Sequence, residues 1–277
     1  MRPRQGDASP WNPFFFIYFL SCCSRIKKEK GSPEGPPPSG GVKGQRPLSS
    51  FWYSGAVVIS SSEIFRLKQM SQFEDELRSQ GFERMVGLDE VGRGPLAGPV
   101  VAAACFLPEA FFLAGLDDSK KLDPEMRERL YKALSENSEV VYGIGVVDAA
   151  EIDRINILQA TFLAMQKAVL TLPFSPDYLL VDGDHLPPKI KTPGRAIVEG
   201  DSRCISIAAA SIIAKVTRDR MMEGLDEKYP LYGFKKHKGY ATLEHRQAIE
   251  LYGICDEHRK SFDPIRSLLE PSLFDLL

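Results

Sequence analysis

Short apolar runs alternate with amphipathic stretches through the middle of the chain, from residue 85 to residue 228. Runs rich in Val, Ile, Leu and Ala predict buried strands, whereas apolar residues that recur every three or four positions predict helices. This alternation predicts an α/β fold, in which the first two strands form a hairpin around a glycine-rich turn. The expected strands are residues 86–88, 100–106, 140–147, 179–181 and 196–198, and the expected helices are residues 124–135, 156–172 and 206–222.

The same pattern divides the chain into three regions. Residues 76–228 carry the alternation and form the α/β region. Residues 229–277, with a helix expected at 242–252, form a small C-terminal helical appendage. Residues 1–75 differ, because Ser32–Ser50 is dense in Pro, Gly and Ser and cannot bury enough apolar surface to fold. We expect residues 1–75 to be a disordered extension or the product of a start codon assigned too early.

An aromatic and apolar segment, Trp11–Cys23, lies within this extension. Its length of about 13 residues is below the roughly 20 needed to cross a bilayer, although it matches the apolar part of a signal peptide. No convincing cleavage site follows, and positive charge continues after the segment, so we favour no export and no membrane contact. We expect the native chain to start at or near Met70, which precedes an acidic, helix-compatible segment.

Overall composition does not identify a partner. Lys and Arg number 35 against 37 Asp and Glu, a formal charge of −2, so an anionic partner must meet a local basic patch. The five cysteines show no zinc-binding spacing. An odd, scattered set predicts reduced thiols in a cytoplasmic chain.

Three of the apolar runs end directly on acidic residues. Carboxylates grouped in an apolar setting repel one another and resist burial unless cations compensate them. Several strands that each end on an acid are typical of an oxygen-ligand site for hard divalent cations, so the sequence predicts a metal-dependent active site. The acids are Asp89 and Glu90 after the first run, Asp182 and Asp184 after the second, and Glu199 and Asp201 after the third.

Six short motifs occur in a fixed order within roughly residues 82–267. They are GLDEVGRGPLAGPVV at 87–101, DSKKL at 118–122, NILQAT at 156–161, VDG at 181–183, GDSR at 200–203 and HKGY at 237–240. Together they resemble bacterial ribonuclease HII. The resemblance implies an RNase H-like mixed central sheet flanked by helices. It also implies hydrolysis of the RNA strand of RNA–DNA hybrids and incision 5′ to single ribonucleotides in duplex DNA, leaving 3′-hydroxyl and 5′-phosphate ends, as ribonucleotide excision repair and replication require.

By this resemblance, four acids are the catalytic residues and hold two Mg²⁺ or Mn²⁺ ions about 4 Å apart, which activate water and stabilise the attacking and leaving oxygens. An ideal strand directs neighbouring side chains to opposite faces, so the adjacent pair can share one site only where the strand ends or bulges. Gly92 supplies the local freedom for such a break. The four acids are Asp89, Glu90, Asp182 and Asp201.

Two of these assignments have rivals in the sequence. Asp184 lies two residues after Asp182 and could reach the same side, but the motif places the ligand directly after the strand. Asp201 could instead cap the helix expected to begin near Ser206. Glu199 is the better candidate for such a structural role.

Recognition of a ribonucleotide requires contact with its 2′-hydroxyl. Gly92 and Gly94 let backbone groups approach a sugar closely, and Arg93 offers a planar fork for a phosphate. By the resemblance, this motif contacts the 2′-hydroxyl and Tyr240 stacks where RNA becomes DNA. The alternatives are a tight hairpin with a surface arginine and a half-buried core tyrosine.

Phosphate contacts dominate affinity for nucleic acids, so basic residues near the motifs are candidate substrate ligands. The candidates are Lys120 and Arg203, and Lys238 from the basic 235–238 segment. Each could equally be a solvated surface residue. His237 is left without an assigned role.

The sequence also bears on a protein partner, on the oligomeric state and on the class of protein. Residues 270–274 resemble, in their Ser-Leu-Phe half, the peptide that docks on a sliding clamp. Nothing in the sequence requires more than a monomer. The alternatives to the main interpretation are a ribonuclease HIII-like enzyme that prefers long hybrids and an inactive nucleic-acid-binding module. The Gly-Arg-Gly motif and Tyr240 argue against the first alternative, and the presence of all four acids argues against the second.

Overall fold

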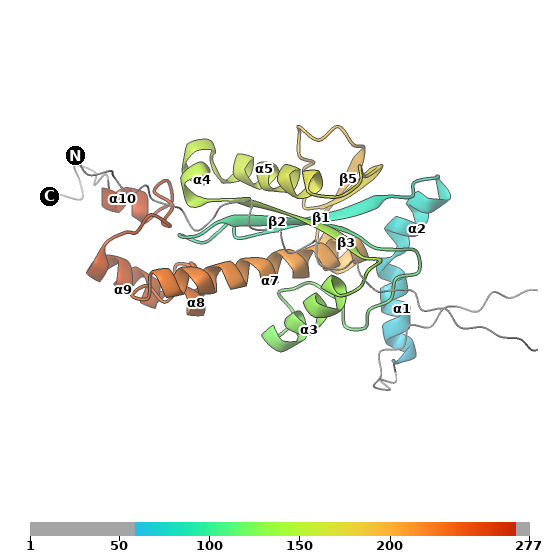
Figure 1. The fold of residues 1–277 in the computed structure, drawn as a ribbon, viewed down its shortest axis with the longest axis horizontal. Helices are drawn as coiled ribbons and strands as arrows, with labels where there is room; N and C mark the ends of the chain where they lie inside the picture. The colour runs from blue at the N-terminus through green and yellow to red at the C-terminus, as the bar shows by residue number, and fades with distance from the viewer. Residues whose placement is uncertain (1–58, 270–277) are drawn as a thin grey trace, which may run out of the picture. The chain divides into compact units, whose positions relative to one another are not determined.

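A five-stranded mixed sheet lies at the centre of residues 59–269, the part of the 277-residue chain that the computed structural model describes (Figure 1). The strand order is β3-β2-β1-β4-β5. β1, the central strand, pairs antiparallel with β2 and parallel with β4, so the sheet is mixed. The strands are β1 (Met85–Val91), β2 (Val100–Phe106), β3 (Val141–Val147), β4 (Tyr178–Asp182) and β5 (Gly194–Ile197).

Helices cover both faces of this sheet, with α4 and α5 on one side and α3 and α7 on the other (Figure 1). The predicted α/β fold with a mixed sheet is confirmed. The long helices match their predicted positions, except that the helix predicted at 206–222 continues to Lys228. In order, the helices are α1 (Ser61–Met70), α2 (Gln72–Ser79), α3 (Pro124–Ser135), α4 (Ala149–Ile155), α5 (Ile157–Leu170), α6 (Gly200–Arg203), α7 (Ile205–Lys228), α8 (Phe234–His237), α9 (Leu243–Tyr252) and α10 (Ile265–Leu269).

The two faces of β1 carry different kinds of residue. Val86 and Leu88 pack into the apolar cluster under α5. Gly87 lies on the opposite face, where a Cβ atom would come within 2.2 Å of the carbonyl carbon of Ser206 at the start of α7. The missing side chain therefore lets α7 lie against the centre of the sheet.

The N-terminal helices α1 and α2 correct the predicted boundary at residue 75. Residues 1–58, including the apolar segment Trp11–Cys23, lie outside the described residues. From Ser61 onward, however, the chain is helical, and Leu67 and Met70 are buried in the core. Ser60 caps α1 by accepting a hydrogen bond from the amide of Glu63, a capping pattern that marks a helix start.

Replacing Leu67 with Ala is expected to lower the free energy of unfolding by about 2–5 kcal/mol, the cost of emptying a buried leucine site. Leu67 is 2% exposed, whereas Phe65 on the same helix is 64% exposed. The matched variant Phe65→Ala should therefore change the free energy by no more than about 0.5 kcal/mol. Urea unfolding of both variants measures this, and equal effects would show that α1 does not pack as described.

Residues 229–269 pack around the C-terminal half of α7. Phe234 of α8 and Ala248 of α9 join Met222 of α7 in one apolar cluster. The amide of Leu96, in the loop between β1 and β2, donates to the carbonyl of Gly239. This appendage is thus tied to the loop that follows the first two acids. No helix in residues 59–269 is long and apolar enough to cross a membrane.

Candidate active site

Three carboxylates meet at one edge of the central sheet. Asp89, Asp182 and Asp201 each offer an oxygen, and these oxygens lie within 4.8 Å of one another. β1 and β4 run parallel with Leu88 opposite Val181, so the residues that follow, Asp89 and Asp182, lie side by side. Asp201 comes from α6, which begins just after β5, the strand next to β4. The sheet topology therefore assembles three of the four predicted acids.

The carboxylate of Asp182 is held by the backbone. Its Oδ1 accepts hydrogen bonds from the amides of Gly200 at 2.7 Å and Asp201 at 3.4 Å. These bonds fix the start of α6 against the end of β4. Asp182 therefore helps to position Asp201, another carboxylate of the same site.

Burial makes the negative charges of this site costly. Asp89 and Asp201 are each 5% exposed. Burial raises the pKa of Asp89 well above its usual value, and the charges of Glu90 and Asp182 raise it further. Burial also raises the pKa of Glu90, against the lowering effect of Arg93. Such a concentration of carboxylate oxygens suits a hard divalent cation, which would compensate the charge.

The predicted break in the first strand does not occur. β1 keeps a regular antiparallel register with β2 through Asp89 and Glu90, and it ends only at Val91. The two acids therefore follow the strand alternation. Glu90 lies outside the group of three carboxylates, and its Oε1 accepts a hydrogen bond from Arg93 at 3.2 Å.

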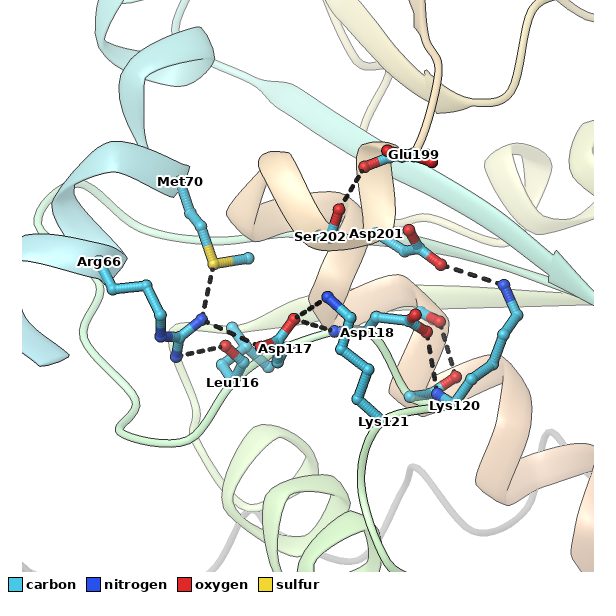
Figure 2. Close-up of polar contacts among 12 residues, drawn as sticks. Arg66, Met70, Leu116, Asp117, Asp118, Lys120, Lys121, Glu199, Asp201 and Ser202 are labelled. Carbon is cyan, nitrogen blue, oxygen red and sulfur yellow. Dashed lines mark hydrogen bonds and ion pairs between the residues drawn. The ribbon is translucent and has the colours of Figure 1, made fainter.

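Lys120 reaches the site from the loop that precedes α3. Its Nζ lies 3.1 Å from Oδ2 of Asp201, and Figure 2 draws this ion pair as a dashed line. Burial is the largest single effect and opposes the charge on Lys120, but the hydrogen bond to Asp201 and the charges of Asp201, Asp118 and Asp89 together outweigh it, so the pKa of the lysine is raised. The side chain is still 76% exposed, so it presents a positive charge at the rim of the acidic cluster.

The Lys120 loop is attached to the N-terminal helices. Arg66 of α1 donates to the carbonyl of Leu116 at 2.8 Å, and Asp117 forms an ion pair with Lys121 (Figure 2). Glu63 of α1 accepts from the amide of Gly115. Helix α1 therefore supports the loop that carries Lys120 to the site.

A second connection runs from α2. Glu74, which is 3% exposed, accepts hydrogen bonds from the amide and hydroxyl of Ser206 in the first turn of α7. A carboxylate at a helix N-terminus satisfies amides that have no partner in the helix. The sequence pattern did not single out Glu74. A lone acid in a polar helix carries no signal of a distant partner.

The Gly-Arg-Gly motif and Tyr240 lie beside each other. A Cβ atom on Gly94 would be 3.8 Å from Cε1 of Tyr240. Tyr240 is 45% exposed, and the side chain of Arg93 is half exposed. Gly92 has a φ of +93°, a conformation that glycine adopts readily. The motif thus forms the start of the loop between β1 and β2, and its exposed surface lies next to Glu90.

The two rival acids lie outside the cluster. Asp184 is exposed and pairs with His185. Glu199 is the residue before α6, with a left-handed backbone and no side-chain cap. Asp201 itself lies inside α6, so it is not the cap of α7; that position belongs to Cys204.

The remaining predicted phosphate contacts have partners of their own. Arg203 donates to the carbonyl of Val198 and lies over the ring of Phe73. Lys238 pairs with Glu223 at 3.0 Å and is only 17% exposed at its side chain. Lys120 is therefore the one predicted basic residue that contacts the acidic cluster.

His237 belongs to a buried group of histidines behind Tyr240. It accepts a hydrogen bond from the amide of Gly239, which leaves Nε2 to donate to the carbonyl of Tyr232. His258 accepts from the amide of Cys255, so its Nε2 donates to His245. His245 in turn donates from Nδ1 to the carbonyl of Tyr240. When the three rings are neutral, each of these hydrogen bonds has one donor and one acceptor. The bonds hold the backbone around Tyr240 in place.

The rings of His245 and His258 are expected to stay neutral in the folded protein down to about pH 5, since burial lowers the pKa of each to about 4. In the unfolded chain they take up protons near pH 6.5. The two groups therefore stabilise the fold fully above that pH, and their contribution is lost as the pH falls toward 4. NMR titration of ring resonances, assigned with His245→Gln and His258→Gln, checks this; midpoints near 6.5 would contradict it.

Comparison with known proteins finds one family. The sequence profile of the family described as Ribonuclease HII matches residues 86–264. A Ribonuclease HII from Bacillus cereus is 50% identical over 228 residues, 82% of this chain and 87% of that protein. A Ribonuclease HII from Bacillus anthracis shows the same identity and coverage.

Solved structures share the fold. Ribonuclease H2 from Pyrococcus horikoshii OT3 is 28% identical with a TM-score of 0.56, covering 67% of this chain and 96% of that one. A chain of the PCNA:RNase HII complex from Archaeoglobus fulgidus is 25% identical with a TM-score of 0.51, covering 65% and 95%. Bst-RNase HIII in complex with Mn²⁺ is 21% identical with a TM-score of 0.54, covering 79% and 78%.

The family profile, the Bacillus relatives and the Pyrococcus structure together show an enzyme of the ribonuclease H class, a phosphodiester hydrolase. Within that class, the chain belongs to the ribonuclease HII family.

Proposed function

We propose that the protein hydrolyses the RNA strand of RNA–DNA hybrids and incises 5′ to single ribonucleotides embedded in duplex DNA, leaving 3′-hydroxyl and 5′-phosphate ends. The observation that carries this proposal is the carboxylate cluster of Asp89, Asp182 and Asp201. A surface suited to reading a sugar, formed by Gly94 and Tyr240, lies near the same end of β1. The Bacillus relatives named Ribonuclease HII support it further.

We propose that these three acids, with Glu90 nearby, hold Mg²⁺ or Mn²⁺ in a two-ion site. The donor set fits, because it consists of carboxylate oxygens in a buried place whose charge Lys120 alone cannot balance. Divalent ions bound there would activate water and stabilise the charge on the reacting phosphate.

Residues of the chain supply the rest of the chemistry. The amides of Gly200 and Asp201 hold Asp182 in place, so the cluster is organised before the substrate binds. Lys120, exposed at the rim, attracts a backbone phosphate toward Asp201. Arg93 offers its guanidinium to a second phosphate, although Glu90 competes for it.

Recognition of the ribonucleotide falls to the Gly-Arg-Gly motif and Tyr240. The glycines leave room for a sugar to approach the backbone, whose amide and carbonyl groups can pair with a 2′-hydroxyl. Tyr240, with about half of its surface free, offers a ring for stacking at the junction of RNA and DNA.

We further propose a cytoplasmic monomer. The three cysteines among the described residues, Cys105, Cys204 and Cys255, are free, which supports a reducing compartment. The Archaeoglobus complex makes a sliding clamp a reasonable partner to propose. The clamp-like peptide at 270–274 lies outside the described residues.

Incision mapping tests the proposed substrate. The full chain would be given three duplexes of one sequence: all DNA, DNA with a single ribonucleotide, and an RNA–DNA hybrid. We expect no cleavage of the first, one cut on the 5′ side of the ribonucleotide in the second, and several cuts in the RNA strand of the third. Cleavage of the hybrid alone would favour the ribonuclease HIII-like alternative, and binding without cleavage would favour the inactive module.

A further inference from the structure

Two arginines lie fully buried beneath the loop that joins β1 to β2. Arg218 of α7 and Arg259, which follows α9, are both 0% exposed. Their hydrogen bonds to described residues all go to backbone carbonyl oxygens, and none goes to a carboxylate. A buried charge is costly without strong partners, so this arrangement needs a reason beyond packing.

Arg259 holds the start of the loop. Its Nη2 donates to the carbonyl of Gly92 at 2.6 Å, and its Nη1 donates to that of Arg93 at 2.9 Å. Nη2 and Nε also reach the carbonyl of Gly98 at the far end of the same loop. One guanidinium thus joins both ends of the loop, and the ring of Phe262 lies 5.0 Å from it.

Arg218 links this loop to the segment that carries Tyr240. Its Nε donates to the carbonyl of Pro99 at 2.9 Å, while Nη1 donates to that of Lys238 at 3.0 Å. Nη2 reaches the carbonyl of Ala97 at 3.3 Å. The Gly-Arg-Gly motif and Tyr240, far apart in sequence, are therefore set against one another through a single side chain.

The first glycine of the motif fits around Arg218. A Cβ atom at Gly92 would lie 2.2 Å from Nε of Arg218. The residue also has a positive φ, which glycine adopts readily, and its carbonyl accepts the hydrogen bond from Arg259. Gly92 is thus required by the buried arginines as well as by any sugar that approaches from outside.

Only arginine meets the geometry of this site. Its planar fork offers five donors in fixed directions, whereas a lysine ammonium is a point charge on a flexible stem. Burial lowers the pKa of Arg218 to about 10 and that of Arg259 to about 9, so both stay charged at neutral pH. Their positive charges lie under the loop, where they favour the approach of a phosphate.

We propose that Arg218 and Arg259 are positioning residues for ribonucleotide recognition, which fix the backbone of Gly92–Arg93 and its placement against Tyr240. This inference rests on the proposed function. Two buried side chains that do not contact the substrate would then help the protein to distinguish ribose from deoxyribose. The carbonyls at 92 and 93 face inward to the arginines, so the outward groups of the loop are held in one orientation.

The test compares affinities for two duplexes that differ by one 2′-hydroxyl. In an Asp89→Asn background, which prevents cleavage, the Kd for all-DNA duplex is divided by the Kd for the duplex with one ribonucleotide. Arg259→Lys keeps the charge but loses the fork. We expect it to lower this ratio at least about tenfold, the effect of one misplaced hydrogen bond to the sugar.

Matched variants separate positioning from stability. Leu134 is fully buried in the core cluster between α3 and α7, so Leu134→Ala destabilises the fold without touching the loop and should leave the ratio within about twofold. If Arg259→Lys does not fold, Arg218→Lys and the milder Phe262→Leu carry the test, each with a lowered ratio. An unchanged ratio in folded arginine variants would overturn the inference. A parent that binds both duplexes equally would instead overturn the proposed recognition of the ribonucleotide.

Discussion

Replacing Asp89 with Asn is expected to stabilise the metal-free protein while cleavage falls by at least about 1,000-fold, the scale on which loss of one member of a catalytic unit acts. The carboxyl is buried beside two other acids, and its pKa is raised for that reason. A group whose folded-state pKa lies above its unfolded value of about 3.9 subtracts stability once the pH exceeds that value. Asparagine removes the charge, so the melting temperature in EDTA at pH 7.5 should rise by about 2 °C or more.

Divalent metal should reverse this order. A ligand that binds only the folded protein stabilises it by about 2.7 kcal/mol at 100 times its Kd. Mn²⁺ should therefore raise the melting temperature of the parent protein and leave that of Asp89→Asn nearly unchanged. Melting curves with and without Mn²⁺ measure this without any substrate. A variant that is less stable in EDTA, or that gains as much from Mn²⁺ as the parent, would contradict the assignment of Asp89 as a buried metal ligand.

Replacing Gly87 with Ala is expected to lower the free energy of unfolding by about 3 kcal/mol or more, the upper end of the range for overpacking. The new methyl group would meet the backbone of Ser206 and Ile207, which lie 2.2 Å and 2.4 Å from its position. No flexible side chain can move aside there. Separation of α7 from β1 would also shift Asp201 relative to Asp89, so activity should fall together with stability.

Gly224 provides the matched control. It lies within α7, has no atom within 4 Å of its would-be Cβ, and has no positive φ. Gly224→Ala should therefore stabilise the protein by about 0.5–1 kcal/mol, because alanine loses less backbone entropy in a helix. Denaturant unfolding of the two variants compares the same change of residue in two environments. Similar effects would show that α7 does not approach β1 as closely as described.

The acids show how far sequence reasoning reaches at this site. Asp89, Asp182 and Asp201 each follow an apolar run, and a sheet brings such positions to one edge, so the cluster could be predicted. The first strand was expected to end at residue 88, and this was wrong, because pairing continues through Val91 opposite Val101 and the charged residues are tolerated inside the strand. The predicted strand ended at the first charged residue, whereas the backbone hydrogen bonds between strands do not depend on side-chain polarity.

Residues that act through distant contacts were harder to predict. Arg259 lies in a polar stretch without periodicity, and its partners are carbonyls more than 150 residues away in the chain, at positions 92, 93 and 98. Backbone partners leave no complementary side chain in the sequence. Helix α1 did carry a local signal, the Ser60–Glu63 cap, but the low-complexity stretch before it drew the predicted boundary too far along the chain.

We propose that a cluster of specific acids, and not acidity at this edge in general, carries the reaction. The most direct measurement compares cleavage of the duplex with one ribonucleotide by Asp182→Asn and Asp184→Asn in Mg²⁺ or Mn²⁺. The two positions are two residues apart, but only Asp182 belongs to the cluster, while Asp184 is exposed and paired with His185. We predict that Asp182→Asn loses cleavage at least about 1,000-fold, the scale for one member of a catalytic unit, and that Asp184→Asn cleaves like the parent. Full activity in Asp182→Asn, or equal loss in both, would contradict the assignment of Asp182 to a catalytic cluster.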